Sequence, residues 1–168
     1  MSQEELDKYY LNVAKVCANN SKAIRKKVGA ILVKKLQIIS DGFNGTPHGF
    51  DNCCEDVICK KPDNIICNKD CNKDCFNCKY AELVTKSEVL HAETSCLMKA
   101  CVSGNSTEGG TLYVTLSPCI NCAKLIIQAE IKRVVYLEDY RDNAGIDLLK
   151  KFGVDVVKLD YLSLHVKK

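Results

Sequence analysis

The chain has 168 residues, of which 46% are hydrophobic, and its 24 basic and 21 acidic residues give a net charge of +3. This length and apolar content predict one domain, 1–168, with a core of its own. The charge is too balanced to predict binding of a nucleic-acid backbone, so we expect no nucleic-acid partner. No apolar run is long enough for a membrane span, and the polar start Ser2–Glu5 lacks a signal-peptide core, so we expect no membrane partner.

The first part of the chain predicts a helix followed by a β-hairpin. Ser2 and Glu5 form a capping-box pattern, and apolar residues then recur at helical spacing to about Asn19. We expect that stripe to pack in the core; its members are Leu6, Tyr9, Tyr10, Val13, Val16 and Cys17. Segments 28–33 and 36–40 are rich in β-formers with two residues between them, which predicts a hairpin, and a loop is expected over 41–49.

The second half of the chain alternates helices and strands. A helix is expected from His91 to about Val102, ending at Gly104. Strands are expected at 111–115, 133–137 and 154–157, with helices beginning at Cys119 and spanning 143–152. This order predicts an α/β fold, a three-layer α/β/α arrangement around a five-stranded mixed sheet.

His91-Ala92-Glu93, followed by Pro118-Cys119-Ile120-Asn121-Cys122, is the pattern that carries chemistry. One imidazole and two thiolates suit zinc, and a catalytic zinc takes three protein ligands and leaves a fourth position for water. Cys119 and Cys122 are three residues apart, so they share one face of a helix, and a helix N-terminus lowers the pKa of a thiol. We therefore expect a catalytic zinc at His91, Cys119 and Cys122.

The same pattern, His-x-Glu then Pro-Cys-x-x-Cys, is the signature of zinc-dependent nucleobase deaminases. Zinc bearing two thiolates and a neutral imidazole has no net charge left, so its water needs a base. Glu93 is expected to take the water proton, pass it to the base ring and protonate the departing amine. The alternative is a structural zinc knuckle with His91 as a core histidine, but it supplies only three ligands where structural sites use four.

Seven of the twelve cysteines lie between Asp51 and Tyr80, in a segment too poor in apolar residues to fold by burial alone. They are Cys53, Cys54, Cys59, Cys67, Cys71, Cys75 and Cys78. Cys75 and Cys78 have the two-residue gap typical of zinc ligands, so we expect at least one structural zinc. The preferred ligand set is Cys53, Cys71, Cys75 and Cys78; a shared two-metal cluster, disulfides or reduced surface cysteines are alternatives. Because the catalytic thiolates must stay reduced, we expect a cytoplasmic protein.

Several blocks of the chain resemble deoxycytidylate deaminases, within the zinc-dependent cytidine and deoxycytidylate deaminase family. These blocks are 27–30, 42–47, 113–119, 122–124 and 131–132, and the likeness covers about 10–157. The Gly-Phe-Asn-Gly loop at 42–45, combined with an insert before His91, is more specific to the nucleotide branch than the metal motif. The resemblance implies a cytidine-deaminase-like fold and a single deaminase domain over 1–168, with a cysteine-rich insert at about 51–80.

The activity implied by the resemblance is hydrolysis of a cyclic amidine C–N bond, converting dCMP to dUMP and ammonia and supplying the thymidylate precursor. It implies that Asn44 bonds the deoxyribose or base, that the loop through Thr46 lines the nucleotide pocket, and that Ser117 and Tyr140 lie at the substrate. Some family members are hexamers regulated by dCTP and dTTP. We accordingly expect a homo-oligomer, with a hexamer favoured, and a regulatory dCTP accompanied by Mg²⁺.

One residue departs from the family pattern. Members usually carry Asn two residues after the motif Glu, where this chain has Ser95, so another cytosine nucleotide is an alternative to dCMP. A deaminase of tRNA or single-stranded DNA would share the zinc site, but the near-neutral charge and the absence of tryptophan count against it. A non-enzymatic zinc module would not need Glu93. Candidates for a phosphate partner, or else a solvated basic face, are Lys22, Arg25, Lys26, Lys27 and Arg141.

Overall fold

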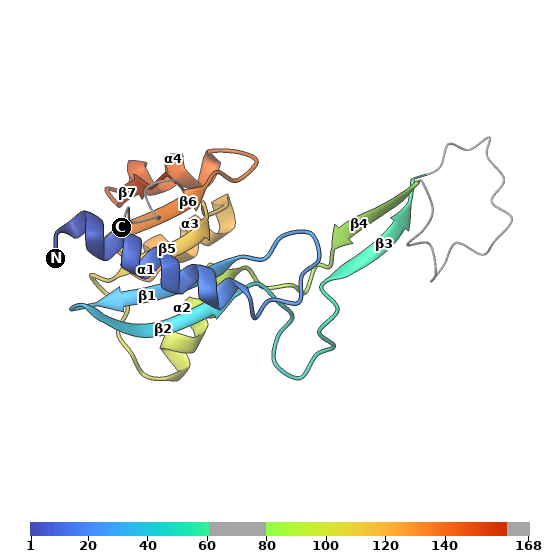
Figure 1. The fold of residues 1–168 in the computed structure, drawn as a ribbon, viewed down its shortest axis with the longest axis horizontal. Coiled ribbons are helices and arrows are strands. Elements are labelled where there is room, and N and C mark those ends of the chain that lie inside the picture. The colour runs from blue at the N-terminus through green and yellow to red at the C-terminus, as the bar shows by residue number, and fades with distance from the viewer. Residues whose placement is uncertain (61–79, 161–168) are drawn as a thin grey trace, which may run out of the picture.

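The computed structural model describes residues 1–60 and 80–160, which form a central sheet, four helices and a separate two-stranded ladder (Figure 1). The helices are α1 (Gln3–Ala18), α2 (Ala92–Val102), α3 (Ile120–Gln128) and α4 (Ala144–Lys151). The strands are β1 (Gly29–Lys34), β2 (Gln37–Phe43), β3 (Glu55–Cys59), β4 (Ala81–Thr85), β5 (Thr111–Leu116), β6 (Arg133–Glu138) and β7 (Asp155–Lys158). Within these residues, no helix is long and apolar enough to span a membrane.

The central sheet has the strand order β2-β1-β5-β6-β7 and mixes both pairing directions. β1 pairs antiparallel with β2 and β5, whereas β5, β6 and β7 are parallel. Successive side chains of a strand point to opposite faces. One face packs on α1 through Ile31, Val33, Tyr113, Val135 and Leu137, and the other packs on α2, α3 and α4 through Ala30, Leu32, Leu112, Val114, Val134 and Tyr136. The predicted three-layer α/β/α architecture with a five-stranded mixed sheet is confirmed.

Two details of the predicted N-terminal part differ in the structure. The capping box of Ser2 and Glu5 is present, and four members of the predicted α1 stripe pack in or against the core, namely Leu6, Tyr10, Val13 and Cys17. The other two members, Tyr9 and Val16, are 53% and 66% exposed, and the small or apolar residues Leu11, Ala14 and Ala18 are buried instead. Spacing alone could not choose between these two overlapping apolar faces.

The β1–β2 turn lies one residue later than predicted. Lys35 and Leu36 have φ angles of 50° and 63°, as a two-residue hairpin turn of the primed type requires, so Leu36 belongs to the turn despite its apolar side chain. β2 then continues to Phe43, and the loop expected from residue 41 begins at Asn44.

The ladder of β3 and β4 was not predicted. Glu55 pairs with Thr85 at one end and Cys59 pairs with Ala81 at the other, and Figure 1 shows the two strands projecting away from the central sheet. Each strand has only five residues, and the partner lies more than twenty positions along the chain, so local periodicity gives no signal. The base of the cysteine-rich insert therefore reaches Thr85.

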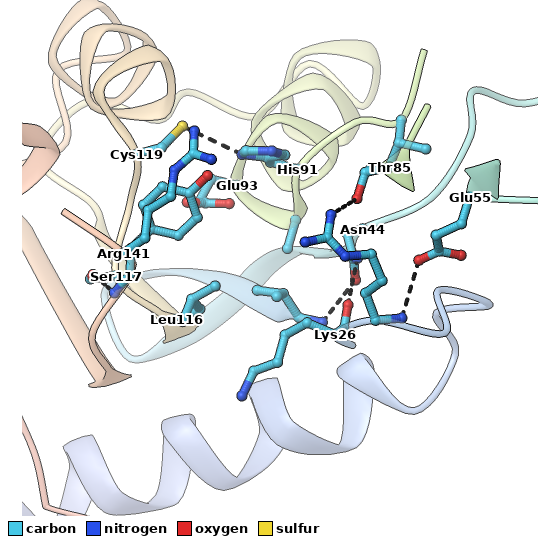
Figure 2. A pocket seen from close by; sticks show the side chains of 15 residues that line it. Lys26, Asn44, Glu55, Thr85, His91, Glu93, Leu116, Ser117, Cys119 and Arg141 are labelled. Atoms are coloured by element: carbon cyan, nitrogen blue, oxygen red, sulfur yellow. Dashed lines mark hydrogen bonds between the residues drawn. The ribbon is translucent and has the colours of Figure 1, made fainter. Parts of the chain in front are cut away.

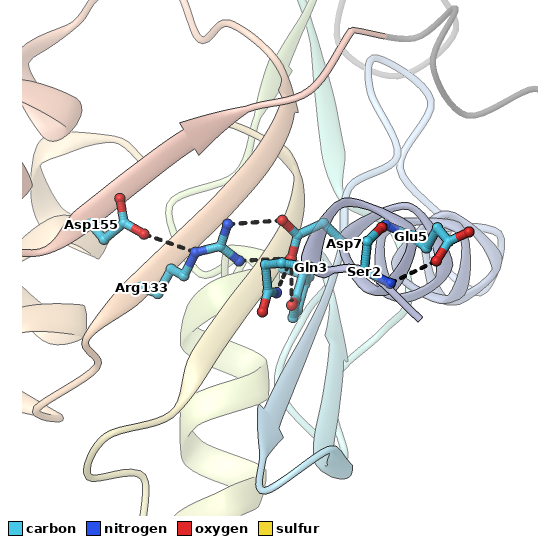
Figure 3. Close-up of polar contacts among 7 residues, drawn as sticks. Ser2, Gln3, Glu5, Asp7, Arg133 and Asp155 are labelled. Carbon is cyan, nitrogen blue, oxygen red and sulfur yellow. Dashed lines mark hydrogen bonds and ion pairs between the residues drawn. The ribbon is translucent and has the colours of Figure 1, made fainter.

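An ion-pair network that is buried at Asp7 and exposed at Asp155 joins α1 to the strands (Figure 3). The Arg133 guanidinium donates from Nη1 and Nη2 to the two oxygens of Asp7, at 2.7 and 2.8 Å, and from Nε to Asp155 at 2.8 Å. Asp7 is only 3% exposed and also accepts from the Tyr113 hydroxyl at 2.9 Å. Burial alone would raise the pKa of the Asp7 carboxyl, but hydrogen bonds from Arg133, Gln3 and Tyr113 hold that pKa below its ordinary value.

Asp7→Asn is expected to lower the free energy of unfolding by about 3 kcal/mol at neutral pH, because it leaves the Arg133 charge partly buried without its main partner. The exposed neighbour gives a control: Asp155→Asn should cost less than about 1 kcal/mol. Since the native pKa of Asp7 is lowered, its contribution is present above its unfolded pKa of about 3.9 and is lost as the pH falls through the native value. Urea unfolding from pH 7 down to pH 3 should show the gap between wild type and Asp7→Asn closing; a constant gap would contradict this account.

Candidate active site

Two helix N-termini meet at the site. His91 is the N-cap of α2 and Glu93 lies in its first turn, whereas Cys119 is the N-cap of α3 and Cys122 lies in that helix's first turn. Pro118 lies directly before this N-cap residue. The helix dipoles place partial positive charge at both N-termini, which favours thiolate and carboxylate there.

The ligand atoms have distances that suit one metal ion. His91 Nδ1 lies 3.5 Å from Cys119 Sγ and 3.4 Å from Cys122 Sγ, and all three ligand atoms lie within 4.8 Å of one another. In tetrahedral zinc sites, Zn–N bonds of about 2.0–2.1 Å and Zn–S bonds of about 2.3 Å place N and S about 3.5 Å apart. The three side chains therefore fit zinc through Nδ1 of the histidine. Among residues 1–60 and 80–160, these three residues form the group of three or more His, Cys, Asp or Glu side chains whose ligand atoms are close enough to share one ion.

The two thiols and the carboxyl have shifted proton affinities. Hydrogen bonds from Cys122 and then His91 lower the pKa of the Cys119 thiol to about 3, and the same bond to Cys119 raises the pKa of Cys122. Burial raises the pKa of the Glu93 carboxyl, whose residue is 3% exposed. A raised pKa makes a carboxylate a better proton acceptor than an exposed one, which suits a general acid–base group.

A cavity of about 350 Å³ opens beside His91 and Glu93 (Figure 2). We call it the active-site cavity, and its lining is Arg25, Lys26, Val28, Asn44, Glu55, Thr85, Val89, His91, Ala92, Glu93, Leu116, Ser117, Cys119, Tyr140 and Arg141. Of the residues implied as substrate contacts, Asn44, Ser117 and Tyr140 line it.

Asn44 and Ser117 also hold the walls of the active-site cavity. Asn44 accepts from the Val28 backbone N–H at 2.7 Å and donates to the Lys26 carbonyl at 2.9 Å. The Ser117 hydroxyl accepts from the Tyr140 backbone N–H at 2.7 Å. Each side chain therefore fixes a neighbouring segment of the cavity wall.

Thr46, which the resemblance implies to line the nucleotide pocket, does not line the active-site cavity. It lines a second hollow, of about 810 Å³, between the end of β2 and α2, and its buried hydroxyl has no partner among the described residues. Ser95, which departs from the family pattern, also lines this second hollow and not the active-site cavity. The substitution at Ser95 thus leaves the lining of the active-site cavity unchanged.

The five basic candidates separate into two groups. Arg25, Lys26 and Arg141 line the active-site cavity, whereas Lys22 and Lys27 do not. Lys26 forms an ion pair with Glu138, and Arg141 lies 3.7 Å from Asp142 and 5.2 Å from the Tyr140 ring. Arg25 donates to the neutral Thr85 hydroxyl at 3.1 Å, and none of the ion pairs among the described residues includes it.

Three residues with a role at the site were missed from the sequence. Glu55 and Thr85 line the active-site cavity from the base of the insert. Gly145, in the first turn of α4, lies against the ligand segment so closely that a Cβ there would be 2.0 Å from the Pro118 carbonyl oxygen and 2.8 Å from the Cys119 carbonyl carbon. No motif marks these positions. Of the predicted second zinc set, Cys53 is exposed, and Cys71, Cys75 and Cys78 lie outside the described residues.

A histidine and a cysteine pair at helix N-termini, with a buried glutamate beside them, is the arrangement of zinc-dependent nucleobase deaminases, and the site assigns the chain to that class. The sequence profile of the cytidine and deoxycytidylate deaminase zinc-binding region matches residues 4–138, and the chain belongs to that family.

Individual relatives agree with this assignment. The chain is 35% identical to the deoxycytidylate deaminase of Enterobacteria phage T4 over 175 residues, covering 92% of this chain and 90% of the relative. It is 36% identical to the human deoxycytidylate deaminase over 143 residues, covering 83% and 68%. The crystal structure of the dCMP deaminase from cyanophage S-TIM5, in complex with dCMP and dUMP, superposes with a TM-score of 0.74 at 36% identity, covering 95% of this chain and 100% of that one.

Proposed function

We propose that the chain hydrolyses dCMP to dUMP and ammonia. The observation that carries this proposal is a cation, Arg25, that belongs to none of the ion pairs of the described residues and lines the same cavity as Glu93 and two of the metal ligands, His91 and Cys119. That arrangement offers one group for a substrate phosphate and another for the chemistry on the base. The similar proteins are named deoxycytidylate deaminases, and the S-TIM5 structure contains dCMP and dUMP.

His91, Cys119 and Cys122 would hold zinc, which supplies Lewis-acid activation of water in such sites. Glu93 moves the protons. Its buried carboxylate takes the first proton of the attacking water and gives it to the ring nitrogen of cytosine; it then takes the second proton of that water and gives it to the amine as the C–N bond breaks, so that ammonia leaves. Asn44, Ser117 and Tyr140 complete the wall that receives the nucleotide.

Selectivity for the phosphate tests the substrate. A charge-assisted hydrogen bond contributes about 1.5–3 kcal/mol, so two of them would favour dCMP over deoxycytidine by about 10²–10⁴-fold in kcat/KM. Arg25→Gln should reduce kcat/KM for dCMP by about 10–100-fold and lower the preference. The adjacent Lys27, which does not line the active-site cavity, provides the control Lys27→Gln.

Ammonia release from dCMP, deoxycytidine, dCTP, tRNA and single-stranded DNA, each at several concentrations, would decide the matter. Equal efficiency on dCMP and deoxycytidine would remove the phosphate contact. Faster release from tRNA or single-stranded DNA than from dCMP would replace the nucleotide substrate by a polynucleotide.

A second metal site in the insert belongs to the same proposal. The cysteine-rich composition of 51–80 and the Cys75-x-x-Cys78 spacing support a structural zinc held by Cys53, Cys71, Cys75 and Cys78. Elemental analysis of reduced protein should give more than one zinc per chain. Cys75→Ser combined with Cys78→Ser should remove about one equivalent while the catalytic zinc stays; one zinc per chain in the wild type would contradict the second site.

Regulation, assembly and location are inferred from the family and from the thiol chemistry. We expect a homo-oligomer, a hexamer in the first instance, and a regulatory site for dCTP with Mg²⁺ and for dTTP. The thiolate ligands require a reducing compartment, which favours the cytoplasm.

A further inference from the structure

The first residue of the insert ladder holds the loop that carries Arg25. Glu55 opens β3 and is 6% exposed. Its carboxylate accepts from the Ile24 backbone N–H at 3.1 and 3.2 Å and from the Arg25 backbone N–H at 3.2 Å. Both carboxylate oxygens are thus directed at two successive backbone donors.

The residue opposite Glu55 in the ladder holds the other end of Arg25. Thr85 is the register partner of Glu55, and its hydroxyl accepts from Arg25 Nη1 at 3.1 Å. Figure 2 shows Glu55 and Thr85 on the same side of the cavity as Asn44, with the dashed contacts running to the loop. One rung of the ladder therefore fixes both the backbone and the guanidinium of the same arginine.

We propose that Glu55 and Thr85 are positioning residues that set the selectivity for a phosphorylated substrate by orienting Arg25. The inference rests on the proposed function, because it takes the substrate phosphate as the partner of Arg25. It also makes the base of the cysteine-rich insert a part of the substrate-binding apparatus.

The rest of the loop has anchors of its own. The Ser21 hydroxyl donates to the Asn44 carbonyl at 2.7 Å, and the Asn44 side chain holds the backbone of Lys26 and Val28. Neither anchor touches residues 24 and 25. Loss of Glu55 should therefore release Arg25 locally and leave the loop as a whole in place.

The sign of the effect distinguishes this role from a simple charge effect. A carboxylate lining a phosphate site would repel the ligand, so its neutralisation would improve phosphate binding if charge were all that mattered. A carboxylate that positions Arg25 gives the opposite result, because its loss misplaces the cation.

Steady-state kinetics with dCMP and deoxycytidine test the proposal in Glu55→Gln and Thr85→Val. Each is expected to lower the ratio of kcat/KM for dCMP to that for deoxycytidine by about 10-fold, mainly through a higher KM for dCMP. Thr85→Ser keeps the hydroxyl and should restore the ratio. The matched control is Glu82→Gln, on the same ladder. The Glu82 carboxylate lies 2.5 Å from Lys60 Nζ, and Glu82 does not line the active-site cavity.

A double-mutant cycle with Arg25→Gln separates positioning from general destabilisation. If Glu55 acts through Arg25, Glu55→Gln should have almost no further effect on the ratio in the Arg25→Gln background. Additive effects, an unchanged ratio or a higher preference for dCMP in the Glu55 variant would overturn the proposal. Thermal unfolding identifies a variant that fails to fold. If Glu55→Gln fails to fold, Thr85→Val, Thr85→Ser and the double-mutant cycle of Thr85→Val with Arg25→Gln test the proposal instead. A wild type without preference for dCMP would instead reject the phosphate contact itself, before any variant is compared.

Discussion

Glu93→Gln is expected to keep the fold and the bound zinc while kcat for dCMP falls by about 10²–10⁴-fold, the usual contribution of general acid–base catalysis. Glutamine has nearly the same size, so the 3% exposed position is refilled without a cavity. It cannot carry a proton, and both proton transfers assigned to Glu93 are lost together. The effect should therefore appear in kcat and leave KM for dCMP comparatively unchanged.

Zinc content and the unfolding midpoint, measured on the same preparation as kcat, complete the test. Glu88→Gln is the matched control, because Glu88 is an exposed glutamate just before His91 and does not line the active-site cavity. A Glu93→Gln enzyme that retains half of the wild-type turnover would exclude Glu93 as the proton carrier.

Cys122→Ser is expected to lose both the catalytic zinc and the activity. Substitutions beside metal ligands typically reduce affinity by about 10–100-fold, and removal of a thiolate ligand should exceed that range. The loss is expected to be severe because Cys122 is buried and lies close to both His91 and Cys119. Among the described residues, the metal-ligand group contains no fourth side chain that could take the place of the lost thiolate.

Zinc should be assayed after dialysis against a mild chelator, with dCMP turnover measured before and after zinc is added back. Cys101→Ser, at an exposed cysteine on α2 remote from the triad, should retain wild-type zinc and turnover. Retention of full activity by Cys122→Ser through the chelator treatment would remove Cys122 from the metal site.

The chemistry of the triad could be predicted because a metal site imposes strict spacing on the sequence. His91 and Glu93 had to lie two residues apart, and Cys119 and Cys122 three apart, and each pair lies at the start of a helix. The central sheet could be predicted for a related reason, since its three inner strands, β1, β5 and β6, are buried on both faces and form short β-rich runs.

Features that depend on contacts distant in sequence could not be predicted. The turn at Lys35 and Leu36 is set by the register between β1 and β2. Leu36, which was expected to begin the second strand of the hairpin, therefore lies in the turn. Glu55 and Thr85 gain their role only when two distant segments pair. Thr46 follows Asn44 closely in sequence, but the chain turns between them, so the two residues line different hollows.

Gly145 gives α4 a share in the metal site although that helix supplies no residue to the active-site cavity. Because the backbone of α4 lies against the carbonyl groups of Pro118 and Cys119 without room for a methyl group, the helix and the ligand segment must move together. Thermodynamic linkage makes the effect reciprocal. Metal binding that fixes Cys119 also favours the packing of α4 on the ligand segment, and a change that weakens this packing weakens metal binding by the same free energy. Helix α4 thus supports the segment that carries Cys119 although it lines no part of the cavity, and substitution of Gly145 is constrained by the metal site of another helix.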